Sequence, residues 1–98
     1  MTPFATGYTE ALRASLPAEH RDAPLAPATV ERIIADCAWM AAFFGPAWDA
    51  RGPLALEEMG RGWFRDRQDG AYTDCVRAFP PLTVSLSDDG LIMLREVA

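Results

Sequence analysis

The sequence predicts an α+β fold, with three or four helices packed against a C-terminal antiparallel β-hairpin. Apolar residues recur at helical spacing through the first two thirds of the chain, and they alternate with polar residues near its end. Half of the 98 residues are hydrophobic, including three Trp and five Phe. A chain of this length and composition is expected to form one domain, residues 1–98, around one packed core.

The first helix is expected from about Gly7 to Leu16. Thr6 can cap its start, and Pro17 ends it. Four apolar side chains recur at helical spacing: Phe4, Tyr8, Leu12 and Leu16. The proline-rich, charged segment from Pro17 to Pro27 is expected to be a solvated connector.

The second helix is expected from Pro27 to Phe44, because proline suits a first helical turn and Gly45-Pro46 suits a helix end. Its apolar face comprises Val30, Ile33, Ile34, Cys37, Ala41 and Phe44, widened by Trp39, Met40 and Phe43. Glu31, Arg32 and Asp36 are expected on the solvent side. A helix with so wide an apolar face is expected to be central.

A second connector is expected to run from Trp48 to Pro53, where the third helix starts. Leu56, Met59 and Trp63 continue a helical face. Gly60 and Gly62 each oppose helix by about 1 kcal/mol relative to alanine. We therefore expect the helix to end or distort near Gly60, and residues Trp63 to Gly70 to form an irregular, structured loop.

Two structures compete for Ala71 to Phe79. Helical spacing of the apolar residues favours a short helix; these residues are Tyr72, Cys75, Val76 and Phe79. The alternative is a hairpin that pairs Trp63–Arg67 with Tyr72–Arg77 around Asp69-Gly70.

The C-terminal segment predicts a β-hairpin. Leu82, Val84 and Leu86 alternate with polar residues, Asp89-Gly90 favours a tight turn, and Leu91 to Val97 returns as the second strand. One face is expected to carry Leu82, Val84, Leu86, Met93 and Val97. Because a two-stranded sheet is marginal alone, this face should pack on the helices.

The charge and targeting signals restrict the function classes. The formal net charge is −5, which argues against a general nucleic-acid binder, and all nine basic residues are arginine. The first residues, M-T-P-F-A-T-G, lack a basic segment followed by an apolar stretch, so no signal peptide is expected. The longest apolar run, Cys37 to Phe44, is too short to cross a bilayer. We expect a cytoplasmic protein with free thiols.

No catalytic or metal-binding motif stands out. His20 is the single histidine and lies in the proline-rich connector, and Cys37 is placed on the apolar helix face, where a thiol is unreactive. Cys37, Cys75 and His20 lack zinc-ligand spacing. The adjacent Glu57 and Glu58 point apart on a helix. We expect no enzyme activity, no metal and no cofactor.

The segment from Met59 to Tyr72 is the candidate partner-binding site. It combines paired aromatics with arginines, and its candidate residues are Arg61, Trp63, Phe64, Arg65, Arg67, Asp69 and Tyr72. Between positions 51 and 77, five arginines are balanced by five acids, so the segment is neutral. An internal ion-pair cluster, a protein-binding loop and a nucleic-acid contact are all open interpretations.

This segment also resembles a group of small phage and prophage proteins of uncharacterised role. The resemblance rests on Gly60, Trp63-Phe64, Arg67, Gly70-Ala71-Tyr72 and Asp88-Asp89-Gly90, which occur in the same order over roughly the last forty residues. Arg61, Gln68 and Asp69 stand where those proteins carry polar His and Asn. The resemblance implies a mobile-element origin and an inhibitor of a host defence complex, similar to anti-CRISPR proteins.

The expected function is non-enzymatic protein binding by a monomer or homodimer, with a host protein or nucleoprotein complex as the partner. One alternative is a winged-helix-like module in which Arg61, Arg65 and Arg67 contact phosphates. A small enzyme is the second alternative, and it would need a pocket that joins His20 or Cys75 to carboxylates.

Overall fold

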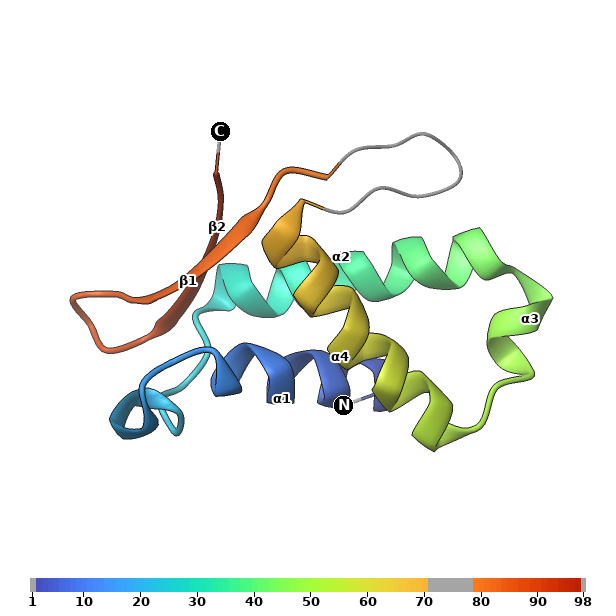
Figure 1. Ribbon diagram of the computed structural model, residues 1–98, viewed down its shortest axis with the longest axis horizontal. Coiled ribbons are helices and arrows are strands. Elements are labelled where there is room, and N and C mark those ends of the chain that lie inside the picture. The colour runs from blue at the N-terminus through green and yellow to red at the C-terminus, as the bar shows by residue number, and fades with distance from the viewer. Residues whose placement is uncertain (1, 71–78, 98) are drawn as a thin grey trace.

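The computed structural model describes residues 2–70 and 79–97, so the short helix predicted for 71–79 lies almost wholly outside the described part. The alternative hairpin is wrong in its first strand, because Trp63–Arg67 are helical. The described elements are α1 (Pro3–Ala14), a 3-10 helix (Ala18–His20), α2 (Pro27–Phe44), α3 (Pro46–Asp49), α4 (Pro53–Asp69), β1 (Leu82–Leu86) and β2 (Ile92–Glu96) (Figure 1). Helices packed against a C-terminal antiparallel hairpin confirm the predicted α+β class.

Helix α1 begins earlier than the sequence indicated. Pro3 occupies its first turn, and the Thr2 hydroxyl accepts a hydrogen bond from the Ala5 amide at 3.2 Å, so Thr2 rather than Thr6 is the cap. The predicted apolar face is confirmed: Phe4, Tyr8, Leu12 and Leu16 are all buried.

Helix α4 does not end near Gly60, and the predicted loop from Trp63 to Gly70 is wrong. The helix runs to Asp69, and Gly70 ends it with a positive φ of 82°. The reason is close packing on α1. A Cβ at Gly60 would overlap the Phe4 carbonyl oxygen, and one at Gly7 would overlap the Glu57 carbonyl oxygen. Contact at this range offsets the low helix propensity of glycine.

The connector predicted after α2 contains one helical turn, α3. Trp48 lies on this turn and packs its ring 5.4 Å from that of Phe4, measured between ring centroids. A second ring, that of Phe44, lies 6.3 Å from Trp48. Aromatic packing of this kind fixes the path of the chain between α2 and α4.

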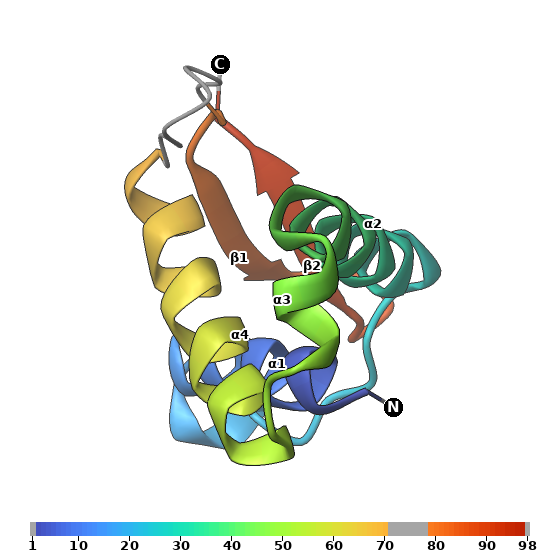
Figure 2. The ribbon, with the colours of Figure 1, turned by 90° about the vertical axis from the view of Figure 1, so that its right-hand side faces the viewer.

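Helix α2 has the predicted bounds but a different orientation about its axis. The side chains that it buries are Thr29, Ile33, Asp36 and Met40. Val30 and Ile34, predicted to be in the core, are 40% and 61% exposed, while Asp36, predicted to face solvent, is buried. Figure 2 shows α4 beside β1 and α2 beside β2, and α2 uses only the side that faces these elements for the core.

The hairpin forms with a register that corrects part of its predicted face. Leu82, Val84 and Leu86 pair with Glu96, Leu94 and Ile92, respectively. Because paired residues share a face, Met93, which pairs with Ser85, lies on the opposite face, and so does Val97. The inward packing is confirmed: Leu82, Ile92 and Leu94 are buried, and Val84 and Leu86 pack against the core half-buried.

The connector before α2 stabilises the two-stranded sheet. Leu25 forms a parallel bridge with Ile92, whose amide donates to the Pro24 carbonyl at 2.8 Å. The Ile92 carbonyl accepts from the Ala26 amide at 3.0 Å and from the Thr29 hydroxyl at 2.8 Å. These bonds join the start of α2 directly to β2.

Candidate functional site

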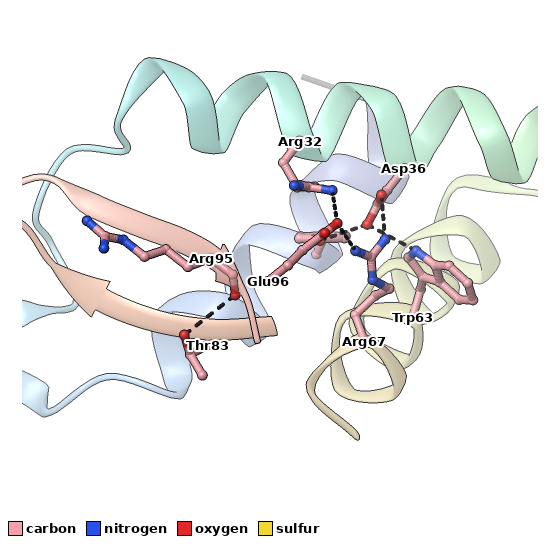
Figure 3. Close-up of polar contacts among 8 residues, drawn as sticks. Arg32, Asp36, Trp63, Arg67, Thr83, Arg95 and Glu96 are labelled. Atoms are coloured by element: carbon pink, nitrogen blue, oxygen red, sulfur yellow. Dashed lines mark hydrogen bonds and ion pairs between the residues drawn. The ribbon is translucent and has the colours of Figure 1, made fainter. Parts of the chain in front are cut away.

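A buried polar network joins α1, α2 and α4 around the carboxylate of Asp36. Its Oδ2 accepts hydrogen bonds from the Tyr8 hydroxyl at 2.8 Å and from Trp63 Nε1 at 3.2 Å. Its Oδ1 accepts from Arg67 Nη1 at 3.0 Å (Figure 3). Donors from two other helices thus converge on one carboxylate, as a buried charge requires.

Burial dominates the ionisation of this network. Burial raises the pKa of Asp36 above its ordinary value of 3.8, and the Arg67 charge and the hydrogen bonds from Tyr8 and Trp63 oppose that rise. Burial, the Asp36 charge and their mutual hydrogen bond also raise the pKa of Tyr8. The Tyr8 hydroxyl therefore stays protonated and donates a hydrogen bond to the Asp36 carboxylate.

The Arg67 guanidinium extends the network to the hairpin. Its Nη2 lies 3.5 Å from Glu96 Oε1 on β2, and the same oxygen accepts a hydrogen bond from Arg32 at 2.7 Å. The guanidinium also stacks over the ring of Phe79, with 4.8 Å from its carbon to the ring centroid. Within the described residues, Nε and Nη2 of Arg67 have no hydrogen-bond partner.

The seven predicted partner-binding residues do not share one surface in the structure. Trp63, Phe64 and Arg67 face the core, and Arg67 is only 1% exposed, so these three cannot meet a partner on the surface of this structure. Arg65 and Asp69 are exposed on the last turns of α4, and Tyr72 lies outside the described residues.

Arg61 also belongs to an ion-pair cluster, although it remains partly exposed. It contacts Glu10 on α1 at 2.7 Å and Glu58 one turn earlier on α4 at 2.8 Å. Hydrogen bonds to Glu58 and then to Glu10 raise the pKa of Arg61. The internal ion-pair interpretation thus describes Arg61 and Arg67. Glu58 belongs to the same segment, whereas Glu10 lies on α1 and Asp36 lies on α2.

The polar network is suited to holding helices together, and it offers no reacting group to solvent. Asp36 is 5% exposed and does not line the surface hollow described below. Among the described residues, no three His, Cys, Asp or Glu side chains are grouped closely enough to hold a metal ion. Nor does any described helix have the length and apolarity needed to cross a membrane.

A second feature lies on the opposite side of α2, which we call the outer face of α2. It comprises Pro27, Val30, Glu31, Ile34, Ala35, Ala38, Ala41 and Ala42, all exposed or half-buried. Glu31 is its single charged residue. This face contains much of the apolar stripe that the sequence placed in the core.

A hollow of about 450 Å³ lies beside the outer face. Thr2 and Ala5 at the start of α1 form one wall, Leu25 closes another, and Ile34 and Ala38 line the side of α2. Cys37 also lines it; this residue is half-buried and packs against the core, so its predicted burial is only partial. Its thiol lies 3.9 Å from the Thr2 hydroxyl.

Sequence reasoning missed both Asp36 and the outer face. A signal was present in the helical repeat, because Asp36 falls seven residues after Thr29 and four before Met40, on one line along the helix. The side of α2 that carries this line has fewer apolar residues than the opposite side. A prediction from hydrophobicity alone therefore placed the wrong side of the helix in the core.

Comparison with known proteins identifies no relative. No family model matches the chain, and neither the curated proteins nor the solved structures contain a significant match. The resemblance to small phage proteins rests on the residues quoted for it and stays a prediction.

Proposed function

We propose that this protein acts without catalysis, by binding another protein through the outer face of α2. The observation that carries the proposal is the orientation of this helix, which buries Asp36 and exposes Val30 and Ile34. Leaving a continuous apolar surface in water is unfavourable, and such patches are typical of protein interaction sites.

The chemistry of the hollow favours a protein side chain over a small metabolite. A volume of about 450 Å³ is within the range of small-molecule sites. Such sites also place several polar groups to orient the ligand, whereas this lining offers only the Thr2 hydroxyl and the Cys37 thiol. Apolar side chains presented at helical spacing need no such groups.

The resemblance to phage proteins supports a narrower version of this proposal. In that version the partner is a host protein or nucleoprotein complex, and binding inhibits a defence system. The net charge of −5 favours a basic partner. Surface acids would then steer the encounter, and the outer face of α2 would supply the apolar contact.

The nucleic-acid alternative has weaker support. Of its three arginines, Arg67 is buried and Arg61 is paired with Glu10 and Glu58. Arg65 is the exposed member of the three. One exposed arginine among the three that this alternative requires is a small electrostatic footprint for a phosphate backbone.

A capture experiment with matched variants tests the proposal. Immobilised wild type, Ile34→Glu and Leu54→Glu would be exposed to host lysate, and the recovered molecules compared quantitatively. Leu54 is the control because it is 77% exposed on α4, away from the outer face. We expect a protein captured by wild type and Leu54→Glu to be lost with Ile34→Glu. Equal capture by the wild type and both variants would contradict the proposed surface. Recovery of nucleic acid alone, with steep salt dependence, would favour the nucleic-acid alternative.

A further inference from the structure

We propose that Arg32 and Arg67 form a binding site for a phosphate group, and that the Glu96 carboxylate occupies this site in the unliganded protein. Figure 3 shows this carboxylate between the two guanidinium groups, which come from α2 and α4. The site is separate from the outer face of α2, to which none of these three residues belongs. It is therefore a second binding function, independent of the proposed protein contact.

The buried guanidinium of Arg67 has hydrogen-bonding capacity that the protein does not use. Its Nη1 donates to Asp36, and its carbon lies over the Phe79 ring, which takes up none of its N–H groups. Within the described residues, Nε and Nη2 donate no hydrogen bond, although the side chain is only 1% exposed. These two nitrogens lie on one edge of the planar group, with their N–H bonds nearly parallel. Because buried donors without an acceptor are costly and rare, this edge is suited to an oxyanion.

Glu96 approaches this edge without satisfying it. Its Oε1 lies 3.5 Å from Arg67 Nη2, and the same oxygen accepts a hydrogen bond from Arg32 Nη1 at 2.7 Å. One carboxylate oxygen thus faces two cations and bonds to one of them. The Glu96 side chain is 41% exposed. An ion pair with such exposure contributes little stability, so Glu96 can turn toward solvent at small cost and give a ligand access to Arg67.

A phosphate group matches these donors better than a carboxylate does. A carboxylate has two oxygens, and bidentate binding to the Nε–Nη2 edge of Arg67 would use both of them. A phosphate group presents a further strong acceptor oxygen, which can bond to Arg32 at the same time. Arginine forks bind phosphate in this bidentate way. The phosphate ion and the phosphate group of a monoester share this chemistry.

The local charges leave room for one anion. Arg32 and Arg67 are balanced in this structure by Asp36 and Glu96. When Glu96 turns toward solvent, the two arginines and Asp36 leave one positive charge at the site. The formal net charge of −5 acts against any anion. We therefore expect weak binding, with a dissociation constant on the order of 1 mM.

Thermal unfolding in sodium phosphate and in sodium chloride of equal ionic strength tests the site. Phosphate should raise the melting temperature of the wild type, since a ligand of the native state stabilises it. Glu96→Gln removes the competing negative charge and should bind phosphate about tenfold more tightly, whereas Arg32→Gln should lose the response. Arg95→Gln is the control, because Arg95 adjoins Glu96 on β2 but lies on the opposite face of the hairpin; it should respond like wild type. Equal responses of wild type, Glu96→Gln and Arg32→Gln would overturn the site as a general salt effect.

The Nε–H resonance of Arg67 reports on the binding edge without any substitution. Titration of the wild type with inorganic phosphate should shift this NMR signal, while that of Arg61, whose Nε donates to Glu58, stays in place. A similar shift with O-phosphoserine would show that the site accepts monoesters, and a shift with inorganic phosphate alone would restrict it to the ion. An equal shift with acetate would overturn the preference for phosphate. A signal that changes with Glu96→Gln but not with phosphate would make Glu96 itself the ligand of this edge and refute the proposal.

Discussion

Arg67 on α4 donates a hydrogen bond from Nη1 to Oδ1 of Asp36 on α2 over 3.0 Å, and both side chains are almost fully buried. This pair links α4, which lies beside β1, to α2, which lies beside β2 (Figures 2 and 3). Its geometry explains why α2 is turned with an aspartate inward. Ionised groups in a core need partners, and Asp36 has three donors while Arg67 has Asp36, the nearby Glu96 and the ring of Phe79.

Removing one member of this pair should destabilise the protein strongly. Arg67→Met leaves the Asp36 carboxylate buried without its cation, and we expect the free energy of unfolding to fall by about 3–5 kcal/mol. Urea denaturation at neutral pH measures this loss. The double variant Asp36→Leu/Arg67→Met should recover part of it, since no unpaired charge remains. A double variant less stable than Arg67→Met would contradict an energetic coupling between the two residues.

The stability difference between wild type and Asp36→Asn should depend on pH. The pKa of Asp36 is raised in the folded protein, so the native state holds this proton more tightly than the unfolded chain does. The associated stabilisation is complete below pH 3.8 and is lost as pH rises through the folded-state pKa. We therefore expect the advantage of wild type over Asp36→Asn to narrow as pH rises above 3.8.

Denaturation midpoints of both proteins, measured at steps from acid to neutral pH, test this sign. Every other ionisable group is present in both proteins, so the difference between them reports mainly on Asp36. An advantage that widens with pH would mean that the Arg67 charge outweighs burial and holds the pKa of Asp36 below its ordinary value.

Trp63 is expected to be an anchor of the fold. Its ring stacks 5.7 Å from that of Trp39, and its Nε1 donates to Asp36. Trp63→Ala should lower the free energy of unfolding by about 3–5 kcal/mol, through lost packing and a lost donor. Trp63→Phe keeps an aromatic ring without the N–H group and should cost less. Thermal unfolding followed by circular dichroism ranks the three proteins, and equal stability of wild type and Trp63→Ala would refute the anchoring role.

Replacing each of the two glycines inside α4 by alanine should change the stability of the protein in opposite directions. Gly60→Ala would push a methyl group into the Phe4 carbonyl oxygen and separate α1 from α4, so stability should fall by 1 kcal/mol or more, at about the magnitude of core overpacking. Nothing lies within 4 Å of a Cβ at Gly62. Gly62→Ala should therefore raise stability by up to about 1 kcal/mol through better helix propensity. Urea midpoints of the two variants decide this, and a stabilising Gly60→Ala would contradict the close contact.

Local sequence signals were sufficient to predict the ends of elements that depend on capping, proline and turn residues. Pro27 and Gly45 mark the bounds of α2, Pro53 marks the start of α4, and the alternation from Leu82 to Leu86 marks β1. Glycine misled the prediction at Gly60, because propensity treats glycine as a helix breaker. Its role in this fold depends on a carbonyl from another helix, which no local pattern reveals.

The candidate site was predictable only in part. The aromatic–arginine segment does contribute two residues to the buried polar network, Trp63 and Arg67. Their shared partner Asp36 lies 31 positions from Arg67 in the sequence. Arg61 likewise pairs with Glu10, 51 positions away. Charge counts within a segment cannot find such pairs, since they depend on which helices become neighbours.

By itself, the sequence determined the α+β class, the apolar face of α1 and the hairpin near the C-terminus, because these follow from capping, periodicity and turn chemistry within short stretches. Tertiary structure alone decided how α2 is turned about its axis. Three donors from α1 and α4 make the burial of Asp36 favourable, and that choice leaves Val30 and Ile34 on the surface. The apolar stripe that the sequence placed in the core is for this reason the surface that we propose binds a partner.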